Sequence, residues 1–424
     1  MSKYGSYTGK SLEFLKSNNV QIGDYVVIKG IIDYEGTLMP RYESNAKDVI
    51  VLKLKNGYNV GIRIDNAGAK KITTSLKSMV KIQKNKIENK NPEKILLLST
   101  GGTIASKIDY RTGAVTPVLL PEDLLTLMPE LVDIANIDVK TIFSEHSENI
   151  VPEQWVKVAK FLDGLAKSEY VGIIITHGTD TMQHTASYLA FALQGFPKPV
   201  ILTGSQRSSD RPSSDAASNL IGSMRFLVSN PNPGIFVAMQ QNGDDVAVHL
   251  ATRVRKNHTS KRGAFETIGS NPAYIVTDGK VEKNLEFFNS DQYLPKITMN
   301  TKVGLVKYYP GFDSGIIDYA VNSGYRALIL EGTGLGHVGR TMYDSIINAS
   351  HDGIFLGMTS QCIDGNVNMN VYESGRDLQK MGVIPLSGML PETALVKAMW
   401  ATGFANSVKD IQDMMTQNIA GEFA

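Results

Sequence analysis

Threonines and glycines follow several apolar runs of this sequence, and a hydroxyl at such a position can attack or orient an amide. Two of these segments, Thr100–Thr103 and Thr176–Thr181, combine both residue types. Glycine lets the backbone approach a ligand closely because it has no Cβ. A single serine or threonine there is better interpreted as the cap of a following helix. For Thr103 and Thr179 taken together, we favour catalysis.

The segment Arg253–Arg262 is rich in basic residues and contains Lys256. A threonine hydroxyl is a poor nucleophile until a neighbouring base takes its proton. A neutral lysine amine, held by an aspartate and a second hydroxyl, can be that base, and burial among like charges favours the neutral form. The alternative interpretation is a solvated basic loop, which is what most clusters of charge are.

Other kinds of catalytic site find little support in the sequence. The segment Gly334–Gly339 matches the dinucleotide-binding pattern, but no acidic residue ends the next expected strand. There is no P-loop, no histidine pair at zinc-hydrolase spacing and no Gly-x-Ser-x-Gly elbow. The one cysteine, Cys362, excludes an internal disulfide framework and a metal site with several cysteines. We therefore predict no metal site in this chain.

Beyond residue 95, continuous apolar runs alternate with helical patterns, as is typical of a parallel sheet covered on both faces. We expect strands at 95–100, 171–176, 200–203 and 234–239, and helices at 153–166, 181–193 and 214–228. Ligands of such sheets bind at the carboxyl ends of the strands, where the threonine segments lie. The fold class predicted is α/β, with two parallel-sheet domains preceded by a small all-β domain.

The first 82 residues have a different pattern. β-branched runs at 48–54 and 58–62 flank Asn56-Gly57, which predicts a hairpin in a small barrel-like β domain. We place a lysine-rich linker at 83–94, a larger α/β domain at 95–290 and a smaller α/β domain at 300–424. This division agrees with the length of 424 residues, since single cores stop growing near ~250–300 residues.

The charges are divided in the same way. The whole chain has 43 basic and 42 acidic residues. Residues 1–94 have 17 basic and 9 acidic residues, whereas residues 95–424 have 26 basic and 33 acidic residues. The basic part is either a solvated lysine-rich face or a surface that meets RNA or an acidic partner. No apolar run reaches the ~18 residues of a membrane span, so we expect no membrane contact and a cytoplasmic location.

Several motifs carry a resemblance to a known family. Thr100–Ala105 and His177–Thr181 resemble the paired threonine motifs of the bacterial-type L-asparaginase family, and Ser147–Trp155 resembles its substrate-binding segment. Ordinary asparaginases have no such basic β domain, and they do not usually carry a segment like Val246–Thr259. With them, the whole chain resembles the family of D subunits of archaeal glutamyl-tRNA(Gln) amidotransferases.

The resemblance implies catalytic roles. Thr103 would be the nucleophile that attacks a side-chain amide and forms an acyl-enzyme. Thr179, Asp180 and Lys256 would relay protons and activate the deacylating water. Backbone N–H groups near Gly102 and Thr179 would stabilise the oxyanion.

The resemblance also implies the binding residues. Ser147 and Glu148 would hold the amino-acid head group of the substrate, with Gly102 and Gly178 beside it, and Asp180 would hold its α-ammonium group. Glu148 departs from the glutamine or serine of many family members. Tyr110 is a possible lid residue, although it follows Thr103 more closely than the family pattern expects.

The function implied is a glutaminase, also acting on asparagine, that supplies ammonia for converting Glu-tRNA(Gln) to Gln-tRNA(Gln). No cofactor is implied in this chain. ATP and Mg²⁺ would bind to the partner, the E subunit of the amidotransferase. The chain would form a homodimer within a heterotetramer. The alternative is a free-standing cytoplasmic L-asparaginase. A regulatory binding module without catalysis is a weaker alternative, because Thr103, Thr179, Asp180 and Lys256 are all present.

Overall fold

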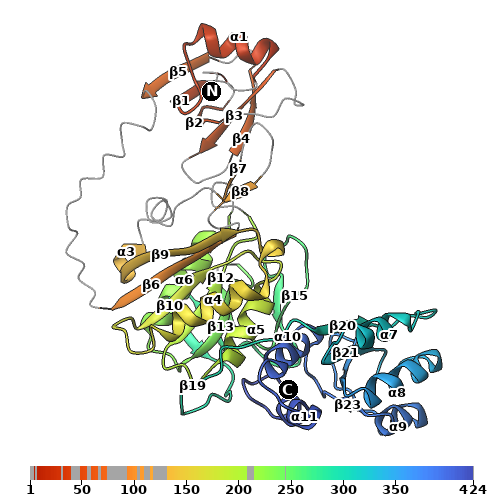
Figure 1. Cartoon of the computed structure of the whole chain (residues 1–424). Coiled ribbons are helices and arrows are strands. Elements are labelled where there is room, and N and C mark those ends of the chain that lie inside the picture. The colour runs from red at the N-terminus through yellow and green to blue at the C-terminus, as the bar shows by residue number, and fades with distance from the viewer. Residues whose placement is uncertain are drawn as a thin grey trace.

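The computed structural model consists of an N-terminal β region followed by two α/β units, coloured from red to blue along the chain in Figure 1. The residues that it describes are 4, 7–29, 32–39, 48–54, 59–64, 68–73, 93–102, 106–108, 115–117, 131–207, 214–243 and 245–423. Among them, no helix is long and apolar enough to cross a membrane.

The N-terminal region is a five-stranded antiparallel sheet with one helix. Its elements are α1 (Gly9–Ser17), β1 (Tyr25–Lys29), β2 (Tyr34–Leu38), β3 (Val49–Leu54), β4 (Asn59–Arg63) and β5 (Gly68–Thr73). Antiparallel pairing of β3 with β4 confirms the predicted hairpin, whose turn at Asn56-Gly57 lies outside the described residues. Val26 and Ile28 of β1 alternate into the core and meet Leu15 of α1, a helix that the sequence did not predict.

The second unit is built on an eight-stranded sheet. Its strands are β6 (Lys94–Gly101), β9 (Asn136–Glu145), β10 (Gly172–Thr176), β12 (Pro199–Thr203), β13 (Gly234–Gln240), β14 (Val246–Leu250), β17 (Tyr274–Thr277) and β18 (Lys280–Lys283). In the order β18-β17-β14-β13-β12-β10-β6-β9, the last five strands are parallel, which confirms the predicted sheet. The antiparallel extension by β14, β17 and β18 was not predicted, because every residue of β14 is buried and no alternation marks it.

Helices cover both faces of this sheet. They are α3 (Leu131–Ile134), α4 (Pro152–Asp163), α5 (Met182–Ala192) and α6 (Ala216–Val228). Leu96 and Leu98 of β6 face the cluster that contains α4 and α5, whereas Ile95 and Leu97 face the cluster that contains α3 and α6. Burial on both faces explains why the strand is a continuous apolar run.

The C-terminal unit has a four-stranded parallel sheet in the order β20-β21-β22-β23. Its elements are β20 (Val303–Lys307), α7 (Gly315–Asn322), β21 (Ala327–Gly332), η4 (Arg340–Met342), α8 (Tyr343–His351), β22 (Phe355–Ser360), α9 (Glu373–Lys380), β23 (Val383–Pro385), α10 (Pro391–Thr402) and α11 (Val408–Thr416). Helix α10 also packs against α5 of the larger unit, with the rings of Trp400 and Phe191 centred 5.9 Å apart. The two α/β units therefore share a core at this helix.

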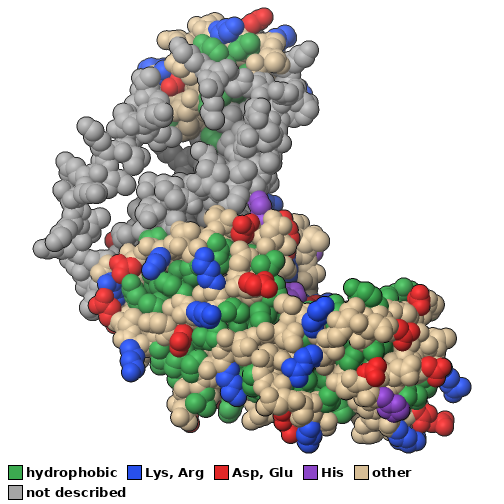
Figure 2. Space-filling view, in the orientation of Figure 1, with side chains coloured by type: hydrophobic (Ala, Val, Ile, Leu, Met, Phe, Trp, Pro, Cys, Tyr) green, Lys and Arg blue, Asp and Glu red, His purple; other side chains and the backbone are tan. Residues whose placement is uncertain are grey.

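The remaining described elements are the antiparallel pairs β7 (Ser106–Ile108) with β8 (Val115–Pro117), β11 (Leu193–Gln194) with β19 (Leu294–Pro295) and β15 (Val254–Lys256) with β16 (Phe265–Thr267), and the 3-10 helix η3 (Ser147–Asn149). On the face drawn in Figure 2, acidic and basic side chains are interspersed over the α/β part. The excess of acidic residues beyond residue 94 is therefore not gathered into one patch on that face.

Candidate active site

Three backbone segments meet at the carboxyl ends of β6, β9 and β10. Gly102 has φ +86°, and a Cβ there would lie 2.4 Å from the backbone N of Gly178 and 2.5 Å from the carbonyl carbon of His177. A Cβ at Gly178 would lie 2.6 Å from Cβ of Ser147. The site therefore needs glycine at both positions, one for its backbone conformation and both for close approach.

The hydroxyls around these glycines link strand to strand. Thr100 Oγ1 donates to the carbonyl of Thr176 at 2.8 Å, and Thr181 Oγ1 donates to the carbonyl of Ser147 at 2.7 Å. Thr181 occupies the N-cap position of α5 but makes no capping hydrogen bond there. At these two threonines, the side chain joins the segments of the site instead of capping a helix.

Lys256 brings the second threonine motif together with the basic segment. Its Nζ donates to Thr179 Oγ1 at 2.8 Å and to Asp180 Oδ1 at 2.6 Å. The Lys256 side chain is 9% exposed and Thr179 is buried, whereas the Asp180 side chain is 66% exposed. The amine thus contacts an enclosed hydroxyl on one side and a solvent-facing carboxylate on the other, an arrangement that can pass a proton between them.

Two elements hold Lys256 in place. It is the last residue of β15 and pairs with Phe265 of β16, which is buried in the core of the larger unit. Its backbone N–H donates to Gln183 Oε1 of α5 at 3.0 Å. The role of Gln183 was not predicted, because nothing local marks a buried glutamine in a helix as a backbone anchor.

The sequence did not predict a role for His177. It is fully buried, and burial lowers its pKa to about 4, so the ring is neutral near pH 7. Nδ1 donates to the carbonyl of Gly178 at 2.7 Å, and Nε2 accepts from Thr185 Oγ1 at 2.9 Å, a tautomer set by the carbonyl. The neutral ring thereby fixes the backbone of Gly178, and its place inside the threonine motif was the one available signal.

The remaining predicted residues are divided between the site, the surface and the part of the chain not described. Ser147 is buried against Gly178, while Glu148 on the same 3-10 turn is exposed. Thr103 and Tyr110 lie outside the described residues, although Thr103 directly follows Gly102. Among the described residues, no group of three His, Cys, Asp or Glu side chains could hold a metal ion.

Comparison with known protein families agrees with this architecture. Residues 94–288 match the family model described as "Asparaginase, N-terminal", and residues 302–415 match "Glutaminase/Asparaginase C-terminal domain". The thermostable L-asparaginase from Thermococcus kodakarensis matches with a TM-score of 0.71 and 32% identity, covering 78% of this chain and 99% of that chain. A probable cytoplasmic L-asparaginase from Campylobacter jejuni matches with a TM-score of 0.67 and 26% identity, over 77% of this chain and 100% of its own. The α/β part is an asparaginase-type amidohydrolase.

The N-terminal region narrows the assignment. Residues 20–72 match the family model "GatD N-terminal domain". The D subunit of glutamyl-tRNA(Gln) amidotransferase from Sulfolobus acidocaldarius is 43% identical over 98% of this chain and 95% of its own length, and the one from Pyrococcus horikoshii is 44% identical over 97% and 96%. The chain belongs to the family of D subunits of glutamyl-tRNA(Gln) amidotransferases.

Proposed function

We propose that this chain hydrolyses the side-chain amide of glutamine, and also of asparagine, through Thr103 and an acyl-enzyme. The observation that supports this proposal most is the position of Lys256 Nζ, within hydrogen-bond distance of Thr179 Oγ1 and Asp180 Oδ1. Thr103 adjoins Gly102, which packs directly on the segment that carries Thr179. The residue before the proposed nucleophile and the segment that carries Thr179 therefore lie at the ends of neighbouring strands.

In the first step, Thr103 Oγ1 forms a bond to the amide carbon, and its proton passes to the leaving nitrogen, which departs as ammonia. Backbone N–H groups near Gly102 and Thr179 stabilise the negative oxygen of the tetrahedral intermediate, and one such donor is worth about 3 kcal/mol of barrier. The neutral His177 ring supports the second of these segments through the Gly178 carbonyl.

In the second step, a water oxygen attacks the acyl carbon and the bond to Thr103 breaks. The water gives its proton to the relay of Thr179, Asp180 and Lys256, and Thr103 is reprotonated as the free acid leaves. Asp180 is exposed enough to meet the α-ammonium group of the substrate as well. Ser147, with Glu148 on the same turn, is the proposed contact of the head group.

The relatives of this chain are subunits of an enzyme that acts on glutamyl-tRNA(Gln), according to their names. We place the chain in the same assembly, in the cytoplasm, as a homodimer within a heterotetramer. The E subunit would use ATP and Mg²⁺ to activate Glu-tRNA(Gln) and would receive the ammonia, so this chain itself needs no cofactor. The basic N-terminal region would face the E subunit or the RNA.

Ammonia release from glutamine and from asparagine tests both parts of the proposal. We expect slow release by the isolated chain and faster release when the E subunit and Glu-tRNA(Gln) are both added. Full asparaginase activity of the isolated chain, without stimulation, would instead support the free-standing L-asparaginase. Thr103→Val should abolish release while Thr103→Ser keeps part of it; normal turnover by a folded Thr103→Val variant would exclude Thr103 as nucleophile.

A further inference from the structure

A buried arginine lies three residues before Lys256. Arg253 is 2% exposed, and its Nη1 donates to the carbonyls of Gly388 at 3.0 Å and Glu422 at 3.1 Å. Its Nη2 donates to the carbonyl of Ile268, which directly follows β16. One guanidinium thus joins the hairpin β15–β16 to the C-terminal tail, which we define as residues 417–423, and to the loop before α10.

The C-terminal tail is itself fixed by a buried ion pair. Lys397 of α10 and Glu422 of the tail are both 0% exposed, and Lys397 Nζ bonds to the Glu422 carboxylate and to the carbonyl of Gln417 at 2.6 Å. The same carboxylate accepts the backbone N–H groups of Ile419 at 3.0 Å and Ala420 at 2.7 Å. A buried charge pair loses its hydration, so these extra hydrogen bonds favour one position of the tail over others.

Residues beside Arg253 contact the C-terminal tail and α10. Thr252 Oγ1 donates to the carbonyl of Ala420 at 2.9 Å, and Thr393 Oγ1 of α10 donates to the carbonyl of Thr252 at 3.0 Å. On the other side, the Arg255 guanidinium lies 3.3 Å from Glu392 Oε1 of α10. Thr252 and Arg253, just before the strand that carries Lys256, therefore contact the C-terminal tail, and Arg255 on that strand contacts α10.

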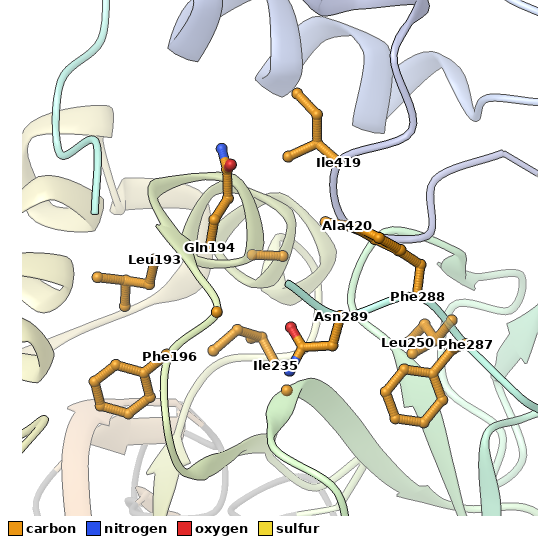
Figure 3. A pocket seen from close by; sticks show the side chains of 13 residues that line it. Leu193, Gln194, Phe196, Ile235, Leu250, Phe287, Phe288, Asn289, Ile419 and Ala420 are labelled. Carbon is orange, nitrogen blue, oxygen red and sulfur yellow. The ribbon is translucent and has the colours of Figure 1, made fainter. Parts of the chain in front are cut away.

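A pocket borders the apolar side of the tail. A cavity of about 30 Å³ remains between Ile419 and Ala420 of the tail and residues of the larger unit such as Leu193 and Leu250 (Figure 3). Apolar packing is incomplete beside Ile419 and Ala420, so the polar contacts of Arg253 and Glu422 add to what fixes the position of the tail.

From these contacts we infer that Arg253 and Glu422 are positioning residues, through which the C-terminal tail sets the distance of the Lys256 amine from Thr179 Oγ1. The inference rests on the proposed role of Lys256 in the relay. Strand β15 has only three residues, and the hairpin residues from His258 to Arg262 are exposed, so beyond the pairing of Lys256 with Phe265 the hairpin depends on contacts with other elements. A misplacement of about 1 Å in such a site can lower the rate ~100-fold.

The experiment compares Arg253→Lys with Arg326→Lys in the full chain assembled with its amidotransferase partner. Arg326 is a matched control, because it also donates to two backbone carbonyls near the end of α10, of Thr402 and Ala405, both at 2.9 Å. Among the described residues, none of its hydrogen bonds reaches the hairpin. For Arg253→Lys we expect kcat for glutamine to fall ~10–100-fold with KM within about threefold of normal. For Arg326→Lys we expect a lowered melting temperature and a normal kcat.

Glu422→Gln keeps the shape of the side chain and gives a second test if Arg253→Lys does not fold. We expect it to lower kcat with little change in KM, as Arg253→Lys does. A normal kcat in folded Arg253→Lys or Glu422→Gln would overturn the inference, and so would an equal loss of kcat in Arg326→Lys. Lys256→Ala separates the two proposals: if that variant is active, the relay assignment fails, whereas an inactive Lys256→Ala with active Arg253→Lys removes only the role of the tail.

Discussion

The two parts of the site are positioned in different ways. Gly102, Gly178 and Ser147 lie at the ends of adjacent parallel strands, and backbone contacts between neighbours hold them. Lys256 lies on a short hairpin whose anchors come from α5, α10 and the C-terminal tail. The strand-end part is thus specified by the sheet itself, whereas the lysine depends on segments that are distant in sequence.

This difference has a consequence for variation. A change at the glycines of the strand ends must disturb the backbone, and therefore the fold, as well as the chemistry. A change in the hairpin or its anchors can move the amine while the sheet stays intact. Stability and turnover should therefore respond differently to substitutions in the two parts.

Within the hairpin, the largest effect on turnover is expected from Lys256→Ala. Loss of a positioned proton-transfer group typically lowers a rate ~10²–10⁴-fold, and Lys256 is the described amine that reaches Thr179 and Asp180. Ammonia release from glutamine measures the effect, and circular dichroism checks the fold. Lys261→Ala, in the exposed part of the same hairpin, is the control and should keep normal activity. An active Lys256→Ala variant would mean that the hairpin is not part of the catalytic machinery.

The glycines of the strand-end part should fail through the fold, as Gly102→Ala can demonstrate. Gly311 has the same φ of +86° but nothing within 4 Å of an added Cβ, so Gly311→Ala measures the conformational cost alone, about 1–2 kcal/mol. Gly102→Ala adds a clash with the backbone of Gly178, for which we expect about 1–3 kcal/mol more. Urea denaturation compares the two variants. Equal losses of stability would show that the contact between the strand ends is not close-packed.

The sequence predicted the strand-end part better than the hairpin, for a physical reason. Continuous apolar runs mark buried parallel strands, and the threonines and glycines after them then lie at the ligand-binding edge. Lys256 makes its hydrogen bond across 77 residues of sequence, so no local pattern could pair it with Thr179, and only the family resemblance did. Whether these residues act as predicted is a question for the activity measurements.

The anchors of the hairpin could not be predicted at all. Arg253 lies in a run of basic residues whose composition favours a solvated loop, yet its guanidinium is buried against three carbonyls. The tail at residues 417–423 has no periodic pattern, and the burial of Glu422 depends on Lys397 in another element. Buried charges of this kind are specified by tertiary partners and leave no signal in composition.

A smaller effect is expected from acid, and it compares the two parts through their histidines. His177 lies beside Gly178, and Nδ1 of His249 lies 2.7 Å from Oγ1 of Thr267 in the hairpin. Burial lowers the pKa of each histidine from 6.5 to about 4. The unfolded chain therefore binds more protons than the folded one between these values. Stability is fully present above about pH 6.5 and falls by about 1.4 kcal/mol per pH unit for each histidine as the pH drops toward 4.

Denaturation at several pH values between 4.5 and 7 tests this dependence. His177→Asn and His249→Asn should each remove one such contribution to the slope, while His351→Asn, on the exposed end of α8, should leave it unchanged. If His177→Asn alone altered the slope, the hairpin side would already be open to solvent in the folded protein. That result would strengthen the contrast between the two parts.

The smallest effect is expected at the rim of the hairpin, from Arg255→Gln. Its contact with Glu392 is 3.3 Å long and the two side chains are 25% and 19% exposed, so solvent screens the pair and its loss should cost less than about 1 kcal/mol. We expect kcat within about threefold of normal, in contrast to Arg253→Lys two residues away. Measuring both variants under the same conditions separates buried from screened anchors of one strand. A loss of turnover in Arg255→Gln as large as in Arg253→Lys would mean that charge near Lys256, and not the buried tail, positions the amine.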